Sequence, residues 1–221
     1  MNQKTVENFI MLLKQVKSPN LFNPYTDICP VHDIGKGSPE IRVNNLRSYF
    51  TLLKTSDVLL MGEAAGYLGC RRTGLAFTDE RTYRILKQNF GITLFKATKS
   101  GKEKEMSATY VWSVLRKLVN PPFLWNIVPF HPHEPNNPLS NRTPTKEDHE
   151  AVKDVVKYFL DNTTFTQIFA VGNVAKKKLK ELKYDVNYIR HPSYGGANKF
   201  KATILENFEK KPMENKLGKW L

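Results

Sequence analysis

The sequence predicts a three-layer α/β/α domain with a central four-stranded, mainly parallel sheet. Four short apolar runs have the length of strands, and segments with apolar residues at helical spacing alternate with them. The first run is continuously apolar, which is typical of a strand covered on both faces. The runs cover residues 57–61, 123–129, 167–171 and 185–190. No internal repeat or linker divides the chain, so we expect a single domain over residues 1–221.

Helical segments account for most of the chain between these runs. Ser38 before Pro39 and Thr143 before Pro144 are typical of an N-cap residue followed by proline at the first helical position. Apolar residues three and four positions apart indicate the remaining helices. We expect helices over residues 3–16, 39–54, 80–90, 110–119, 144–161, 174–183 and 197–210.

The charge of the chain indicates a polyanionic partner. Its 221 residues include 34 Lys and Arg against 21 Asp and Glu, which gives a formal charge of +13. Nucleic acid fits this balance best. No apolar stretch is long enough to span a membrane, and the N-terminus lacks a signal-peptide pattern. We therefore expect a cytoplasmic protein that acts without a membrane partner.

The cysteine content excludes several kinds of site. Cys29 and Cys70 are too few for a disulfide scaffold or an all-cysteine iron–sulfur cluster. Cys29 and His32 have the spacing of a partial metal site, but no second ligand pair completes it. His131 and His133 lie beside prolines on an expected loop, where hydrogen bonding or phosphate contact is commoner than metal binding. We expect no metal and no cofactor.

A glycine-rich segment over residues 61–80 follows the first predicted strand. It contains Glu63, Arg71, Arg72 and Phe77 among four glycines. Glycines let the backbone approach a ligand, and arginines suit phosphate. The segment is either a ligand-binding loop at the carboxyl end of the sheet or a structural turn with solvated arginines.

Two further polar residues belong to the same predicted edge of the sheet. Asn126 lies within the second strand, where a buried amide serves as a structural bridge or reads the edge of a ligand. His191 ends the fourth strand. The charged stretch 96–105 is instead expected to be an exposed loop, either solvated or in contact with phosphate.

Together these segments resemble the uracil-DNA glycosylase superfamily. Its iron–sulfur branch has a GEAPG loop ending in GxPF, a strand with Asn followed by NRTP, and a late HPS motif. The matching segments here are residues 62–66, 74–77, 126, 141–144 and 191–193, in the same order. Ala65 and Ala76 replace the two prolines, and the cluster cysteines are missing. The chain therefore resembles a relative of that branch without the cluster.

The resemblance implies a monofunctional DNA glycosylase that flips a nucleotide into a pocket and hydrolyses its N-glycosidic bond. Phe77 would stack on the base, and Asn126 would donate to uracil O4 and accept from N3–H. Gly62 and Ala64 would complete the base-binding wall. A mismatched edge, such as that of cytosine, would leave polar groups unpaired.

The resemblance also implies catalytic and DNA-binding roles. His191 would hydrogen-bond the base O2 as negative charge develops, and Glu63 would orient water and stabilise the cationic sugar. Tyr194 is either a wedge that fills the space of the flipped base or a loop aromatic packed on the protein. Phosphate and DNA contacts are expected from Arg71, Arg72, Arg142, Ser193 and Gly195.

Several alternatives stay open at this point. Gly66 stands where other branches place a bulky residue that rejects thymine, so the base is uracil, hypoxanthine, xanthine or mismatched thymine. A catalytically silent nucleic-acid-binding protein of the same fold is the main rival. A nucleotide-binding module or small-molecule glycosidase is a third interpretation. We expect a monomer that binds DNA containing uracil or another deaminated base.

Overall fold

The computed structural model describes residues 1–99, 102–193 and 195–210. Four strands form one sheet in the order β3-β2-β5-β6, and every neighbouring pair is parallel. The strands are β2 (Val58–Ala64), β3 (Phe123–Val128), β5 (Gln167–Val171) and β6 (Asn187–Ile189). The predicted fold class is therefore confirmed.

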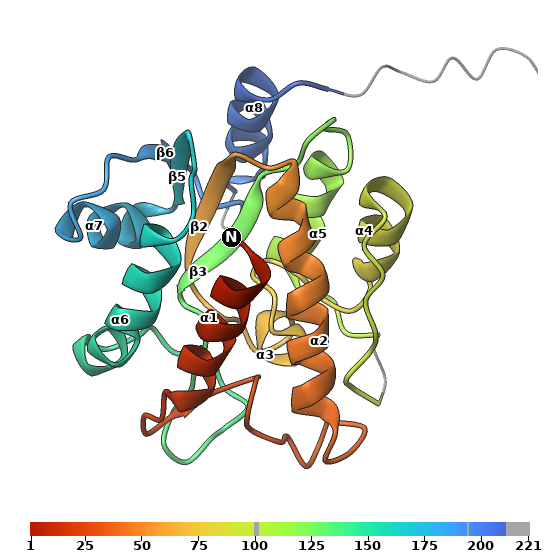
Figure 1. Ribbon diagram of the computed structural model, residues 1–221, viewed down its shortest axis with the longest axis vertical. Helices are drawn as coiled ribbons and strands as arrows, with labels where there is room; N and C mark the ends of the chain where they lie inside the picture. Colours follow the sequence, from red (N-terminus) through yellow and green to blue (C-terminus); the bar gives the residue numbers. More distant parts are fainter. Residues whose placement is uncertain (100–101, 194, 211–221) are drawn as a thin grey trace, which may run out of the picture.

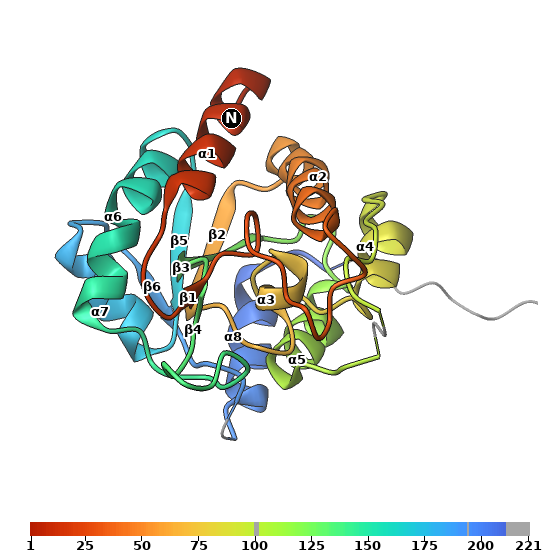
Figure 2. The ribbon, with the colours of Figure 1, turned by 90° about the horizontal axis from the view of Figure 1, so that it is seen from below.

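Helices cover both faces of this sheet (Figure 1). The path from β2 to β3 runs one way along the sheet, and the path from β3 through β5 to β6 runs the other way. Right-handed crossovers then place the connecting helices on opposite faces. Figure 2 shows α6 and α7, with α1, on one side and α2 to α5 with α8 on the other.

The helices have the following bounds: α1 (Gln3–Gln15), α2 (Ser38–Phe50), α3 (Cys70–Thr73), α4 (Tyr83–Phe90), α5 (Met106–Leu115), α6 (Lys146–Asp161), α7 (Asn173–Glu181) and α8 (Ala197–Asn207). A 3₁₀ helix, η1 (Thr51–Lys54), follows α2. Two short strands, β1 (Leu21–Phe22) and β4 (His131–Pro132), pair antiparallel. They join the N-terminal loop to the segment after β3.

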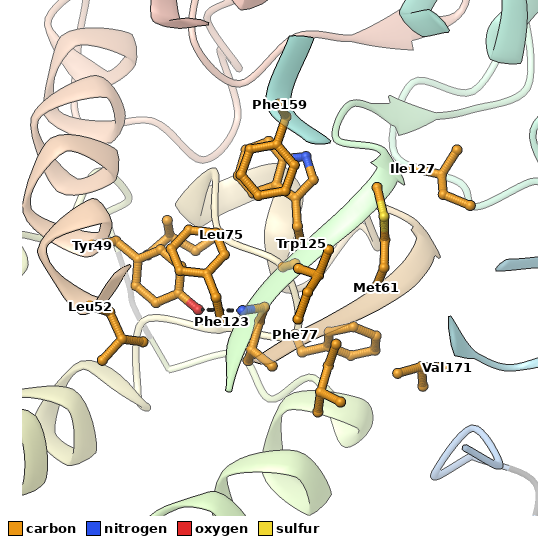
Figure 3. Packing of buried hydrophobic residues seen from close by; sticks show 14 of the residues in the cluster. Tyr49, Leu52, Met61, Leu75, Phe77, Phe123, Trp125, Ile127, Phe159 and Val171 are labelled. Atoms are coloured by element: carbon orange, nitrogen blue, oxygen red, sulfur yellow. Dashed lines mark hydrogen bonds between the residues drawn. The ribbon is translucent and has the colours of Figure 1, made fainter. Parts of the chain in front are cut away.

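Successive side chains of β3 point to opposite faces of the sheet, so that one set packs in the hydrophobic core and the other lies on the opposite face. Trp125 lies 5.4 Å from Phe159 of α6 and 5.5 Å from Phe9 of α1, measured between ring centroids, and Figure 3 shows the first of these contacts. The Tyr49 hydroxyl accepts a hydrogen bond from the backbone amide of Leu124 at 3.0 Å. Because neighbouring residues of a strand point to opposite faces, Asn126 lies on the face opposite Trp125.

Several predicted boundaries differ from the structure. The predicted N-cap of α2 is wrong, because Ser38 is itself helical and its hydroxyl donates to the carbonyl of Ala97 at 2.8 Å. The predicted start of α6 at Pro144 is also wrong. Thr145 is the N-cap, and it forms a reciprocal capping box with Asp148.

Other differences are shifts of a few residues. β2 extends three residues beyond its predicted end, to Ala64, whereas β6 is shorter than expected at both ends. α4 begins later than predicted, and α5 begins and ends earlier. Among the described helices, none is long and apolar enough to cross a membrane.

Candidate active site

A cavity of about 820 Å³ opens at the carboxyl end of the parallel sheet. Open α/β sheets bind ligands at this edge, because the segments after their strands converge there. Seven of the residues predicted from the sequence line it together: Glu63, Ala64, Phe77, Asn126, Arg142, His191 and Ser193. They come from β2, the loop before α4, β3, the segment between β4 and α6, and the segment after β6. The predicted residues at the ends of the strands therefore lie together at one edge of the sheet, as the strand order led us to expect.

Gly62 lies behind the cavity, where β2 and β3 run side by side. It is the direct partner of Asn126 in the sheet register. A Cβ atom at Gly62 would lie 2.5 Å from the Phe77 ring and 2.6 Å from Asn126 Oδ1. The missing side chain is what allows this ring and this amide to occupy the same end of the sheet.

The backbone of Phe77 has a φ of +50°, in the left-handed region that favours glycine. Hydrogen bonds on both sides hold it there. The Thr73 hydroxyl donates to the Thr78 carbonyl at 2.9 Å and accepts from the Leu75 amide at 3.1 Å. The Thr78 hydroxyl in turn accepts from the Trp112 indole at 3.3 Å. The turn therefore presents one face of the buried ring to the cavity.

The amide of Asn126 has a defined orientation. Its Nδ2 lies 3.8 Å from the Cys70 sulfur, and its Oδ1 lies on the side of Gly62. Burial raises the pKa of the Cys70 thiol, so the sulfur is neutral and serves as a weak acceptor. One donor and one acceptor of the amide thus lie side by side at the cavity wall.

His191 lies next to the same ring, with its centroid 6.1 Å from that of Phe77. The backbone amide of Ser193 donates to His191 Nδ1 at 3.2 Å. A ring nitrogen that accepts carries no proton, so the neutral ring keeps its proton on Nε2. Burial, followed by the charge of Arg190, lowers the pKa of His191 and favours this neutral form. His191 is therefore equipped to donate one hydrogen bond.

Glu63 lies at the end of β2 with its side chain half-buried. Its Oε1 is shielded from solvent and has no hydrogen-bond partner in the described part of the chain. Burial raises the pKa of this carboxyl group above its ordinary value. A carboxylate with an unused acceptor and raised basicity can hold and polarise a water molecule.

Arg71 and Arg72 do not lie where the sequence analysis expected them. Both side chains are buried, at 3% and 5% exposure, which contradicts the expected contacts with DNA phosphates. Arg71 lies over the ring of Phe22 at 3.6 Å, and Arg72 pairs with Glu103 at 3.0 Å. Both arginines therefore face the interior of the protein rather than its surface.

Arg142 lines the cavity but is also occupied by the protein. Its side chain is 14% exposed, and it pairs with the buried Asp148 at 2.5 Å. It also donates to the backbone carbonyls of His133 at 2.8 Å and Asn20 at 3.3 Å. These bonds fix the segment after β4, and any contact of Arg142 with DNA stays a prediction.

The remaining predicted residues have different outcomes. Gly195 has a φ of +74°, a conformation that suits glycine, and it is exposed. Tyr194 lies outside the described residues. His131 is buried and its Nε2 lies 3.3 Å from Asn141 Oδ1, while burial lowers its pKa to about 3. The described residues contain no group of three or more side chains suited to a metal ion.

Comparison with known proteins gives the family. The model of the family described as "Uracil DNA glycosylase superfamily" matches residues 50–216. The chain belongs to this superfamily. The matched region contains every residue of the cavity described above, from Glu63 to Ser193. The resemblance inferred from the motifs is confirmed.

A solved structure shares the superfamily fold with this chain. It is described as the crystal structure of wild-type Pedobacter heparinus SMUG2. The two chains are 16% identical, with a TM-score of 0.62, and the match covers 91% of this chain and 95% of the other. Comparison with curated proteins gives no match.

The iron–sulfur cluster of one branch of the superfamily does not fit this chain. Its sequence contains only Cys29 and Cys70, and both thiols are free and buried. Cys70 contacts the amide of Asn126 in the cavity wall. Four cysteine ligands are required for such a cluster, and this chain has only two cysteines.

Glu105 is one of the cavity residues that the sequence analysis did not predict. It lies directly before α5 and lines the cavity, although we expected residues 96–105 to form an exposed loop, either solvated or in contact with phosphate. Its backbone amide donates to Asp79 at 3.1 Å, which ties it to the loop after Phe77. Burial raises the pKa of Glu105 to about 6. Nothing in a stretch of charged residues indicates that one of them contacts a residue far away in the sequence.

Proposed function

We propose that this member of the superfamily is a monofunctional DNA glycosylase. It hydrolyses the N-glycosidic bond of uracil, or of another deaminated base, and leaves an abasic site in DNA. The observation that carries the proposal is the convergence of Phe77, Asn126, His191 and Glu63 on one cavity. Each offers the chemistry that one part of the reaction requires.

Base recognition rests on Phe77 and Asn126. A flipped base stacks on the exposed face of the ring, as base-flipping enzymes require. Asn126 Nδ2 donates to uracil O4, and Oδ1 accepts from N3–H. Cytosine presents the reverse pattern, with a donor at position 4 and an acceptor at N3. The pocket would then leave two polar groups unpaired, which disfavours cytosine strongly.

Bond cleavage rests on His191 and Glu63. The departing base gains negative charge at O2, where the Nε2 proton of His191 donates a hydrogen bond. Such a donor stabilises the transition state by about 3 kcal/mol. The carboxylate of Glu63 stabilises the cationic sugar and orients the water that attacks C1′. Water supplies hydroxide to the sugar, and the base leaves with its electron pair and is then protonated.

The test uses single- and double-stranded oligonucleotides that carry uracil, hypoxanthine, xanthine or thymine mismatched with guanine. Alkaline cleavage after incubation reveals abasic sites, and we expect strand breaks at uracil or another deaminated base. Asn126→Ala and His191→Ala should each reduce turnover while leaving the fold intact. Tight binding without any abasic product would contradict the enzyme proposal and favour a silent DNA-binding protein.

A further inference from the structure

A groove of about 640 Å³ lies between α4, α5 and the loop that follows α4. It shares no lining residue with the cavity of the proposed reaction. Figures 1 and 2 both show the two helices as neighbours. Four cationic residues line this α4–α5 groove, and all four are exposed: Arg81, Arg84, Lys96 and Arg116.

These cations lack an anionic partner within the protein. In the described part of the chain none of the four forms an ion pair, whereas Arg47 on the neighbouring α2 pairs with Glu7 at 2.8 Å. Asp79 and Glu80 also line the groove, but both are buried, at 1% and 6% exposure. The charged side chains that the groove exposes among the described residues are therefore all positive.

The backbone beneath the cations is held in place from inside. Glu80 Oε1 accepts a hydrogen bond from the Ala97 amide at 2.7 Å, and its Oε2 accepts from the Thr98 hydroxyl at 2.6 Å. Arg81 follows Glu80 and Lys96 precedes Ala97, so one buried carboxylate keeps the two stretches that carry these cations together. Like charges held around a hollow repel one another and raise its positive potential, which attracts an anion.

The groove and the cavity are close neighbours along two segments of the chain. Phe77 lines the cavity and Asp79 lines the groove, while on the other segment Glu105 lines the cavity and Thr109 lines the groove. Asp79 Oδ2 accepts a hydrogen bond from the Glu105 amide at 3.1 Å, which joins the two segments. A polyanion that enters the cavity therefore passes within reach of the groove. Taking DNA as that polyanion rests on the proposed function.

We propose that the α4–α5 groove binds the phosphate backbone of one arm of the DNA, beyond the nucleotide that enters the cavity. Guanidinium groups match the oxygens of a phosphate group, and three of the four cations are arginines. Contacts of this kind raise affinity and hold the protein in register on the duplex, but they do not read its sequence. The groove lies on one side of the cavity, so it serves one arm of the duplex.

The first test measures binding alone, by fluorescence anisotropy with a labelled undamaged duplex over a series of salt concentrations. Arg84→Ala/Arg116→Ala should reduce the slope of log affinity against log salt by about 2, through the loss of two phosphate contacts. The matched control is Lys87→Ala/Lys117→Ala, which removes two neighbouring exposed cations that do not line the groove and should keep the wild-type slope. An unchanged slope in the groove variant, or an equal loss in the control, would overturn the inference.

The second test identifies the arm, with kcat/KM on duplexes that carry uracil at the centre, near one end or near the other. Arg84→Ala/Arg116→Ala should lower kcat/KM about threefold to tenfold on the central uracil and on one terminal uracil. On the other terminal uracil, where the arm that reaches the groove is missing, it should match wild type. A loss at both ends would contradict the assignment to one arm.

The two tests separate the inference from the proposed function. The absence of uracil removal by wild type would contradict the proposed function, whereas the salt slope still tests the groove because it needs no turnover. Uracil removal with a wild-type slope in the groove variant would overturn the inference alone. An unchanged midpoint of thermal unfolding shows that each variant has folded.

Discussion

At Gly62 the absence of one carbon atom shapes the cavity. We predict that Gly62→Ala lowers kcat/KM on uracil-containing DNA by on the order of 100-fold. A Cβ atom at 2.5 Å from Phe77 and 2.6 Å from Asn126 Oδ1 forces both groups to shift, and misplacement of about 1 Å has effects of this size. Steady-state kinetics with an abasic-site assay measures the change.

The matched control is Gly35→Ala, because a Cβ atom there would have no heavy atom within 4 Å. Its activity should stay close to that of wild type. Wild-type kinetics in Gly62→Ala would show that Phe77 and Asn126 do not need their observed positions for turnover.

The raised pKa of Glu63 predicts how activity depends on pH. A carboxylate with a raised pKa takes up its proton at a higher pH than an ordinary Glu, so activity that needs the ionised form declines as pH falls and begins to do so above 4.5. His191, with its pKa lowered by burial, takes up its proton at a lower pH than an ordinary histidine does.

The measurement is kcat/KM on uracil-containing DNA from about pH 8 to about pH 4, a range that spans ordinary Glu and His pKa values. Glu63→Gln should be slower and should lose the decline attributed to the carboxylate. A decline of the same shape in this variant would assign it to another group.

Single residues of the site could be predicted from the sequence only where they belong to a recognisable motif. Phe77, Asn126 and His191 came from short segments in a fixed order, and all three line the cavity. Arg71 was assigned to phosphate because arginine suits anions, but the sequence cannot show that the ring of Phe22 covers it. Glu105 was missed because its partners lie far away in the chain.

At the scale of secondary-structure elements, the start of α6 is held by Arg142, which the sequence analysis expected to contact DNA. We predict that Arg142→Ala lowers the free energy of unfolding by about 3 kcal/mol, because it leaves the buried Asp148 without its partner. Chemical denaturation measures the loss. Lys153→Ala removes an exposed cation from the same helix and should change stability by less than about 1 kcal/mol. Equal stability of the two variants would contradict the structural role of Arg142.

Strands were predicted better than helix ends. β5 has the predicted bounds, and β3 differs by one residue, because continuous apolar runs mark buried strands directly. The start of a helix depends on which polar side chain accepts hydrogen bonds from the first backbone amides of the helix. We expected Thr143 to be the N-cap of α6, whereas the reciprocal bond with Asp148 places the N-cap at Thr145.

For the whole molecule, the formal charge of +13 predicts DNA binding that weakens with salt. A second cavity of about 380 Å³ adjoins the first, since both are lined by Glu63, and Lys177 of α7 lies on its wall. We predict that Lys177→Ala reduces the slope of log affinity against log salt by about 1, through the loss of one phosphate contact.

Fluorescence anisotropy with labelled DNA over a series of salt concentrations measures this slope. Lys87→Ala on α4, which lies on the other side of the sheet, should leave it unchanged (Figure 2). Equal slopes for wild type and Lys177→Ala would show that DNA does not reach this wall.

The left-handed backbone of Phe77 has a consequence for comparing relatives of this chain. Such a conformation disfavours the folded state by about 1–3 kcal/mol for any residue other than glycine. The buried ring also packs in the hydrophobic core, so glycine here would remove the backbone strain and the ring contacts together. A superfamily member with glycine at this turn would be a candidate for a protein that has given up base removal.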